Sequence, residues 1–230
     1  MARYGVLAVG ALAVLCADSA LAADMVVKAQ PAAAPIATVG RWYIEARLGF
    51  PFRKNYNIDI VAIGPGTYRP DSGFHGAFDV GYAFTPNWRA EIEATWTQGK
   101  NGNVVLGAAN LPHTGKTDVY TFNVNGFYTF IMHPMFQPFV GAGIGIASYK
   151  VNNLGAVGGG FVINDSQTTL LLALHAGVDI PISQRFALTG RYTLAHTGDM
   201  TFASVPAGNA TTRKSTFDSV LSGGLRFYLN

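Results

Sequence analysis

Eight stretches of the chain alternate apolar and polar residues with a period of two, which is the period of a β-strand. In the last stretch, Leu225, Phe227 and Leu229 fall on one face of the expected strand. Arg226 and Tyr228 fall on the opposite face, so this strand has one apolar and one polar side. The eight predicted strands cover residues 41–50, 73–84, 88–97, 118–130, 136–149, 168–180, 185–194 and 216–230.

The connections between these strands alternate in length. Three are tight, at residues 85–87, 131–135 and 181–184. Four are long, at residues 51–72, 98–117, 150–167 and 195–215, and they are rich in Gly, Asn, Pro and Lys. A short–long alternation over an even number of strands is typical of membrane-spanning barrels. The pattern therefore predicts an all-β fold, an eight-stranded antiparallel up-and-down transmembrane β-barrel.

The direction of the apolar face separates a membrane barrel from a soluble one, because a soluble barrel with the same alternation points its apolar side chains inward. Every Lys lies in the N-terminal segment, in a connection or at a strand end. Acidic residues and Arg nearly balance on the polar faces, as expected of paired charges inside a barrel. Large aromatic residues gather near strand ends, which is typical of interfacial belts. They are Trp42, Phe50, Phe74, Phe84, Trp88, Trp96, Tyr120 and Phe130.

Composition supports the membrane interpretation. The 230 residues are 49% hydrophobic and 13% charged, about half the charged share of a typical soluble domain. No segment approaches the roughly 18 apolar residues of a transmembrane helix. The net charge of +3 is not concentrated in a cluster of Lys and Arg, so no nucleic-acid partner is expected.

The N-terminus has the organisation of a secretory signal. Arg3 precedes an apolar run over residues 5–16, and Ala20-Leu21-Ala22 has the spacing of a cleavage site. We expect residues 1–22 to be a signal peptide, 23–40 an Ala/Pro-rich periplasmic linker and 41–230 the barrel. Cleavage would remove Cys16, the single cysteine, so no disulfide is expected.

The interior of an eight-stranded barrel is just wide enough for side chains to fill it. Long charged side chains on the polar face should therefore leave a narrow, largely plugged lumen. The predicted lumen network comprises Glu45, Arg47, Asp79, Arg89, Glu91, Glu93, Asp179, Arg191, Asp218 and Arg226.

Several segments, in this order, carry a resemblance to a known family. They are Ala-Leu-Ala-Ala-Asp-Met-Val-Val-Lys-Ala at residues 20–29, Trp-Tyr-Ile at 42–44, Pro-Phe-Val-Gly-Ala-Gly-Ile-Gly at 138–145, Gly-Arg-Tyr-Thr at 190–193 with Gly-Asp at 198–199, and the final strand. The chain resembles the small OmpA-like outer-membrane barrels of Gram-negative bacteria, in particular the stand-alone porin-family surface antigens.

This resemblance implies an outer-membrane protein surrounded by lipid and lipopolysaccharide. It also implies that the barrel-assembly machinery recognises the last strand through Ser222, Gly224, Phe227 and Leu229. The chain departs from the family at Asn230, where an aromatic residue is usual.

No catalytic, cofactor or metal site is predicted. The five His residues lack metal-ligand spacing on one face, and ion pairing explains Glu91 and Glu93 better than acid–base chemistry. Lipid A deacylase barrels use a His and a Ser two residues apart, but His196 is followed by Thr197 and Gly198. The favoured function is a structural or surface role. The alternatives are a small-solute or ion porin and a surface adhesin that binds extracellular ligands through its long connections. A lipid A-modifying barrel enzyme is a third, disfavoured alternative.

Overall fold

The computed structural model describes residues 40–52, 55–60, 64–106, 109–156, 162–205 and 210–229. The predicted signal peptide, nearly all of the linker, and Asn230 lie outside these residues. Within the described part, no helix is long and apolar enough to cross a bilayer.

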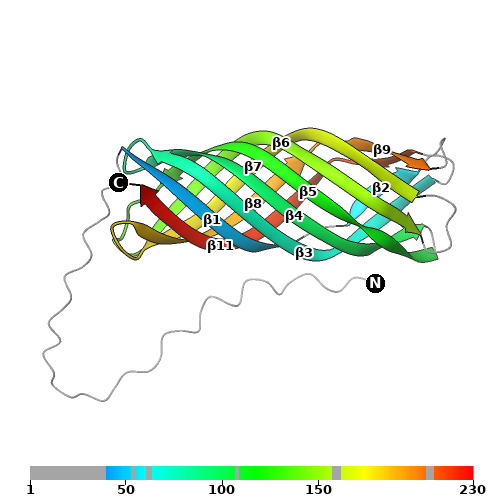
Figure 1. Cartoon of the computed structure of the whole chain (residues 1–230), viewed down its shortest axis with the longest axis horizontal. Coiled ribbons are helices and arrows are strands. Elements are labelled where there is room, and N and C mark those ends of the chain that lie inside the picture. Colours follow the sequence, from blue (N-terminus) through cyan, green and yellow to red (C-terminus); the bar gives the residue numbers. More distant parts are fainter. Residues whose placement is uncertain are drawn as a thin grey trace, which may run out of the picture. The chain divides into compact units, whose positions relative to one another are not determined.

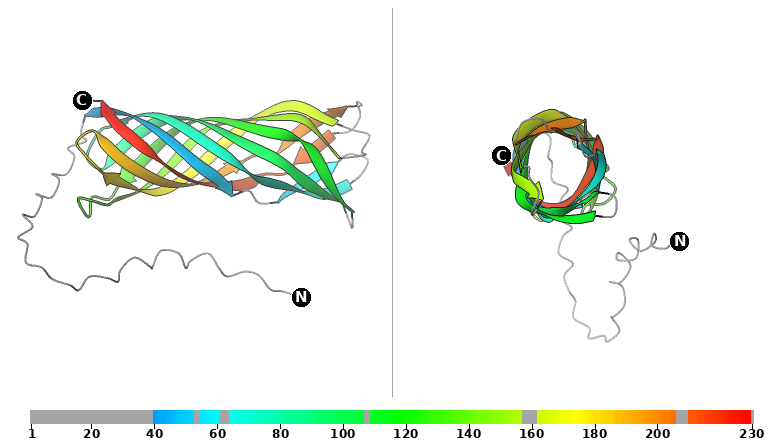
Figure 2. Two further views of the ribbon diagram at one scale, coloured as in Figure 1. Left: turned by 60° about the horizontal axis from the view of Figure 1, so that its bottom comes forward. Right: turned by 90° about the vertical axis from the view of Figure 1, so that its right-hand side faces the viewer.

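Eight strands form a closed antiparallel ring, which confirms the predicted fold (Figures 1 and 2). The first strand pairs with the third strand on one side and with the last strand on the other, so the ring has no free edge. In chain order its strands are β1 (Arg41–Phe52), β3 (Gly64–Ala83), β4 (Trp88–Leu106), β5 (Ala109–Thr129), β6 (Gln137–Ala156), β7 (Val162–Pro181), β8 (Phe186–Thr197) and β11 (Thr216–Leu229). We call this the membrane ring.

At the end of the barrel with the tight turns, every strand terminus lies within one residue of the sequence prediction. A hydroxyl side chain explains two of these turns. The amides of Asn87 and Trp88 donate to Thr85 Oγ1 at 3.3 and 2.9 Å. Ser183 Oγ accepts in the same way from the amides of Arg185 and Phe186. These bonds stop the ladder at a defined residue.

The opposite end differs from the prediction, because the four expected long connections are mostly strand. β3 to β7 are 19 to 21 residues long, whereas a strand needs about 9–11 residues to cross the hydrocarbon layer. Roughly half of each of these strands therefore continues beyond the apolar band.

Three further strands, β2 (Tyr56–Ile60), β9 (Met200–Val205) and β10 (Ala210–Arg213), lie in the same region. They pair in the order β3, β2, β10, β9, β7, and so replace β1, β11 and β8 beyond the membrane ring. Together with the ends of β3 to β7 they close a second ring of eight strands, which we call the outer ring (Figure 1).

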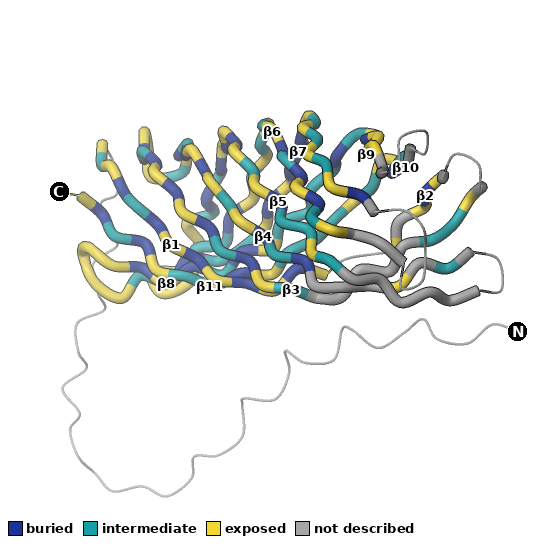
Figure 3. Tube along the Cα trace, turned by 45° about the vertical axis from the view of Figure 1, so that its right-hand side comes forward, coloured by how far each residue is buried: buried dark blue, intermediate teal, exposed yellow. Residues whose placement is uncertain are grey.

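The alternation of apolar and polar residues inverts between the two rings. On β6, Ile144 and Ile146 are exposed on the outside of the membrane ring, whereas Tyr149 and Val151 are buried inside the outer ring. The burial pattern along the strands is drawn in Figure 3. The outer ring has an apolar inside and a polar outside, which is the arrangement expected of a barrel wall that faces water. The buried apolar cluster of the outer ring comprises Val119, Ala147, Tyr149, Val151, Ile163, Leu171, Ala173, Met200 and Phe202.

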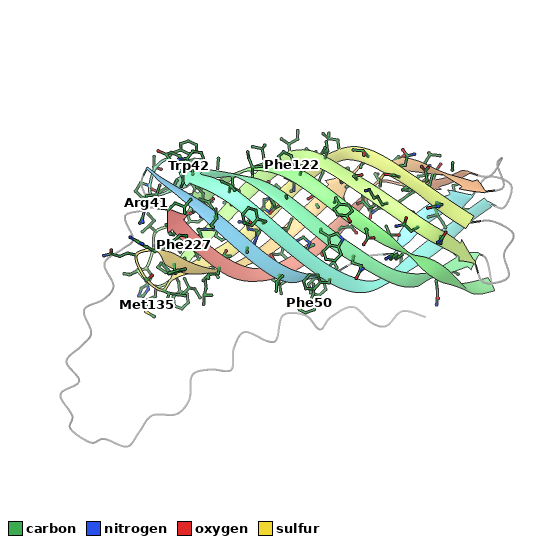
Figure 4. The ribbon with its side chains drawn as sticks, viewed as in Figure 1. Arg41, Trp42, Phe50, Phe122, Met135 and Phe227 are labelled. Carbon is green, nitrogen blue, oxygen red and sulfur yellow. The ribbon has the colours of Figure 1, made fainter. Side chains whose placement is uncertain are left out.

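The outside of the membrane ring is an apolar band with aromatic residues at its edge. At the tight-turn end, Trp42 packs on Tyr82 with ring centroids 5.1 Å apart, and Trp88 packs on Tyr128 at 5.0 Å. Figure 4 shows Trp42, Phe50 and Phe122 projecting from the wall. Leu48, Phe50 and many other large apolar side chains are exposed. Such a surface is stable only against lipid.

Candidate functional site: the ionic layer of the lumen

Charged side chains from six strands meet inside the membrane ring, and all of them are buried. β1, β4 and β3 supply most of the acidic groups. β7 and β8 lie across the lumen from β3 and β4, and β11 is next to β1. This ionic layer consists of Glu45, Arg47, Asp79, Arg89, Glu91, Glu93, Asp179, Arg191 and Arg226.

Arg191 is the centre of the layer and is fully buried. Its Nη1 lies 2.5 Å from Glu91 Oε1, and its Nη2 lies 3.2 Å from Glu91 Oε2, so the pair is bidentate. Arg191 also donates to Glu45 at 3.1 Å and to Glu93 at 3.2 Å. One guanidinium therefore joins three carboxylates, an arrangement to which the fixed fork of Arg is suited.

Two further Arg residues extend the layer. Arg226 bonds Glu45 Oε2 through Nε at 2.7 Å and Asp179 Oδ2 through Nη1 at 2.7 Å. Arg47 Nε lies 3.1 Å from Glu45 Oε1, and Arg47 Nη2 lies 2.9 Å from Asp79. Arg47 also bonds Glu93. Glu45 is therefore shared by three Arg residues, and no single strand pair accounts for its position.

Arg89 anchors the layer on the side of the tight turns. It pairs with Asp179 at 3.0 Å and donates to Thr129 Oγ1 at 2.7 Å. Its guanidinium carbon lies 4.8 and 4.5 Å from the ring centres of Phe127 and Phe139. These cation–π contacts place an aromatic surface against the charge within a confined space.

Neutral polar groups add further hydrogen bonds to the layer. The Tyr43 hydroxyl donates to Glu91 Oε2 at 3.0 Å, and Asn123 Nδ2 donates to Glu93 Oε1 at 3.0 Å. His175 lies 3.0 Å from Thr193 Oγ1 through Nδ1 and 3.3 Å from Asn125 Oδ1 through Nε2. These bonds offset part of the cost of burying charge. Arg191 Nε and Asp179 Oδ1 are buried without a hydrogen-bond partner among the described residues.

Glycines on neighbouring strands make room for the large inward side chains. Tyr43 is paired with Gly81, and Arg47 with Gly224. A methyl group at either glycine would overlap the side chain of its partner. The glycines of β6 make room in the same way for inward side chains of β5. The β5–β6 pairs are Asn123 with Gly145, Asn125 with Gly143 and Phe127 with Gly141.

Asp218 differs from the other predicted lumen residues, because it lies outside the ionic layer. It pairs with Arg213 at 3.1 Å, nearer the outer ring. Arg213 lies on β10, in a segment that we expected to be a loop, so the sequence did not indicate this pair. Arg213 also stacks on Tyr149 at 4.7 Å.

Sequence reasoning also missed that Phe127 and Phe139 point inward, where their rings meet edge to face at 5.6 Å. Their positions along the strands could have shown this, because every second residue of a strand points to the same face. Phe127 shares its strand face with Asn123 and Asn125, and Phe139 shares its face with Gly141.

Water-sized space lies on both sides of the ionic layer. A cavity of about 80 Å³ on the side of the outer ring reaches down to Arg47, Glu93 and Asn123. A smaller one of about 10 Å³ on the other side is bounded by Arg89 and Asp179, among others. These two cavities share no lining residue, and the Arg191–Glu91 pair lines neither of them.

The carboxylates of Asp79, Glu91 and Glu93 have oxygens within 4.8 Å of one another, which is compatible with a metal ion. Arg47 and Arg191 already form ion pairs with these carboxylates. The two guanidinium groups therefore supply the positive charge that a metal ion would otherwise provide. We assign no metal to them. His196, at the position compared with the deacylases, packs against Phe217 with centroids 4.7 Å apart, while the next residue, Thr197, is buried.

An eight-stranded antiparallel ring with an apolar outside and an ionic inside defines a transmembrane barrel of the outer-membrane class. The family model described as "Outer membrane protein beta-barrel domain" matches residues 19–227. The chain belongs to this family. The protein therefore resides in the outer membrane of a Gram-negative bacterium, in contact with its lipid and lipopolysaccharide.

Individual relatives agree with this assignment. The chain is 26% identical to the outer membrane protein PagN of Salmonella typhimurium over 182 residues, which are 73% of this chain and 72% of PagN. The structure of OprG from Pseudomonas aeruginosa superposes with a TM-score of 0.65 at 13% identity, over 84% of this chain and 97% of OprG. Neisserial surface protein A superposes with a TM-score of 0.51 at 16% identity, over 81% of this chain and 96% of that protein.

Proposed function

We propose that the protein is a structural outer-membrane barrel with a closed lumen and a rigid surface outside the cell, and that it is neither a general porin nor an enzyme. The observation that carries this proposal is the Arg191–Glu91 pair, which bridges the lumen between two separate water-accessible cavities. A solute could pass only if it displaced several buried ion pairs at once. Breaking one such pair costs about 3–5 kcal/mol.

The outer ring supports the surface role. Its strands continue the barrel wall, so the long hairpins are not free loops. In outer-membrane barrels the short turns face the periplasm, and we infer from this rule that the outer ring lies outside the cell. Its outward side chains, such as Asn57, Asp59, Ser166 and Thr201, are exposed and polar. A rigid polar surface of this kind suits contact with extracellular ligands.

We further propose that the last strand carries the assembly signal. In the structure Ser222 is buried inside the lumen, while Leu229 is exposed on the apolar band. Gly224 has the parity of Ser222, and Phe227 has the parity of Leu229. The two faces of β11 thus present the polar and apolar halves of the proposed signal separately.

A liposome-swelling assay tests the closed lumen. Liposomes that contain the refolded protein should swell in isotonic arabinose no faster than liposomes without protein. A general porin in the same lipids is the positive control. Swelling by the wild-type protein that approaches the rate of the porin would overturn the proposal.

A further inference from the structure

The apolar band ends on the extracellular side of β4, β5 and β6 in a group of aromatic and charged side chains. Trp96 and Tyr120 are paired across β4 and β5, and both are exposed on the outside of the barrel. Trp96 Nε1 donates to Asp118 Oδ1 at 3.3 Å. Tryptophan and tyrosine with a polar tip mark the level at which hydrocarbon meets lipid headgroups.

The side chain of Lys150, on β6, points along the barrel wall toward the ring of Tyr120. Its Cα is paired with Asp118, whereas Tyr120 is paired with Ser148, two residues nearer the bilayer. Lys150 Nζ lies 5.4 Å from the centre of the Tyr120 ring. Among the described residues, no carboxylate forms an ion pair with Lys150. The ammonium is therefore held at headgroup level without an acidic partner from that part of the chain.

Lys116 of β5 supplies a second cation on the same outward surface. It is exposed and paired with Asn152, two residues along β6 from Lys150. Lys116 and Lys150 are thus diagonal neighbours across the ladder, and such neighbours lie about 7–8 Å apart. Two ammonium groups on long flexible stems at this spacing can both reach one phosphate group.

We propose that Lys116 and Lys150, bordered by Tyr120 and Trp96, form a binding site for a phosphate group of lipopolysaccharide in the outer leaflet. The charges are complementary, the position is that of the headgroups, and the aromatic rings lie next to the acyl region. The site is on the outside of the wall, so it does not depend on whether the lumen is closed.

Lys214 provides a matched control. It is exposed between β10 and β11, and β11 lies four places from β5 in the membrane ring, on the opposite side of the barrel. Among the described residues, no aromatic ring contact with Lys214 is present. The variant Lys214→Gln removes one external lysine but leaves the proposed site intact.

The test measures binding of purified lipid A to the refolded protein in detergent by native mass spectrometry. The probes are lipid A with its phosphates, lipid A after removal of the phosphates, and inorganic phosphate. Lys116→Gln and Lys150→Gln should each weaken binding of phosphorylated lipid A about fivefold. Lys150→Arg should retain most of the binding, and Lys214→Gln should match the wild type.

Each other outcome overturns the proposal. Equal binding of phosphorylated and dephosphorylated lipid A would show that phosphate is not recognised. A loss with Lys214→Gln as large as with Lys150→Gln would show only general attraction to the surface. If inorganic phosphate bound as tightly as lipid A, the site would recognise phosphate in general and not the phosphate of a lipid. All variants should first show the gel-mobility shift on heating that reports a folded barrel.

Discussion

Arg191 bonds Glu91 across the full width of the lumen. The two residues lie on β8 and β4, four places apart in the ring of eight strands, and are joined by contacts of 2.5 and 3.2 Å. The pair therefore ties opposite walls of the barrel together. Glu91 and Arg191 are 100 residues apart in the chain, so their bond closes a long stretch of the polypeptide.

Removing Arg191 should destabilise the barrel strongly. Arg191→Ala leaves Glu91 without an ion-pair partner among the described residues, while Glu45 and Glu93 keep only their other Arg partners. Breaking a buried pair costs about 3–5 kcal/mol. Urea unfolding of the refolded protein in micelles measures this loss. Arg185→Gln, at an exposed turn, is the control and should change the free energy of unfolding by less than about 0.5 kcal/mol. Equal stabilities for the two variants would contradict the central role of Arg191.

The glycine pairing gives a second prediction. A Cβ at Gly143 would overlap Asn125 Oδ1, whereas a Cβ at Gly126 meets nothing within 4 Å. Gly143→Ala should therefore lower the yield of folded barrel, and Gly126→Ala should leave it unchanged or raise it slightly. The heat-dependent mobility shift after refolding measures both yields. If Gly143→Ala folds as well as Gly126→Ala, the packing of Asn125 is not tight.

The topology predicts where a lysine-specific protease cuts intact cells. Lys214 is exposed between β10 and β11, outside any strand. Lys116 and Lys150 lie within paired strands, which resist cleavage. Mass spectrometry of the fragments should therefore show cleavage after Lys214, with Lys28 cut only after the outer membrane is permeabilised. Cleavage at Lys28 in intact cells, with Lys214 spared, would invert the orientation.

Asp165 should make one contact of the outer ring sensitive to acid. It lies on β7 beyond the apolar band, and the Ala203 amide of β9 donates to its Oδ2 at 2.9 Å. This bond lowers the pKa of Asp165 below its usual value. The contact is therefore fully stabilising above the unfolded pKa of about 3.9 and weakens as pH falls through the lower folded pKa.

Hydrogen exchange at the Ala203 amide measures this effect. After correction for intrinsic exchange, protection in the wild type should fall below about pH 4. Asp165→Asn keeps an acceptor oxygen but does not titrate, so its protection should not depend on pH in this range. An identical acid response in both proteins would assign the effect to another group.

Much of the membrane ring could be predicted from the sequence, because lipid outside and a polar lumen inside impose a strict period of two. Trp42, Ile44 and Leu48 are intermediate or exposed, and Glu45 and Arg47 are buried, as their parity requires. The tight turns could be located as well, since Pro and the hydroxyl residues break the alternation abruptly.

The outer ring could not be predicted in the same way. The alternation inverts on β6 between Ile146 and Ala147 when the outside changes from lipid to water, and a short inverted run resembles a loss of pattern. The ion-pair partner of each lumen charge could not be predicted either. Parity places Arg191 in the lumen, but its bond to Glu91 depends on the stagger of strands that do not touch.

The most direct test of the closed lumen is single-channel recording in planar bilayers. The wild-type barrel should give no reproducible conductance steps, because the ionic layer separates the two cavities. In variants that fold, Arg191→Ala should open the layer. The resulting current should be cation-selective, since the layer then keeps three Arg residues against five carboxylates. Large, reproducible channels in the wild type, unchanged by Arg191→Ala, would contradict the account.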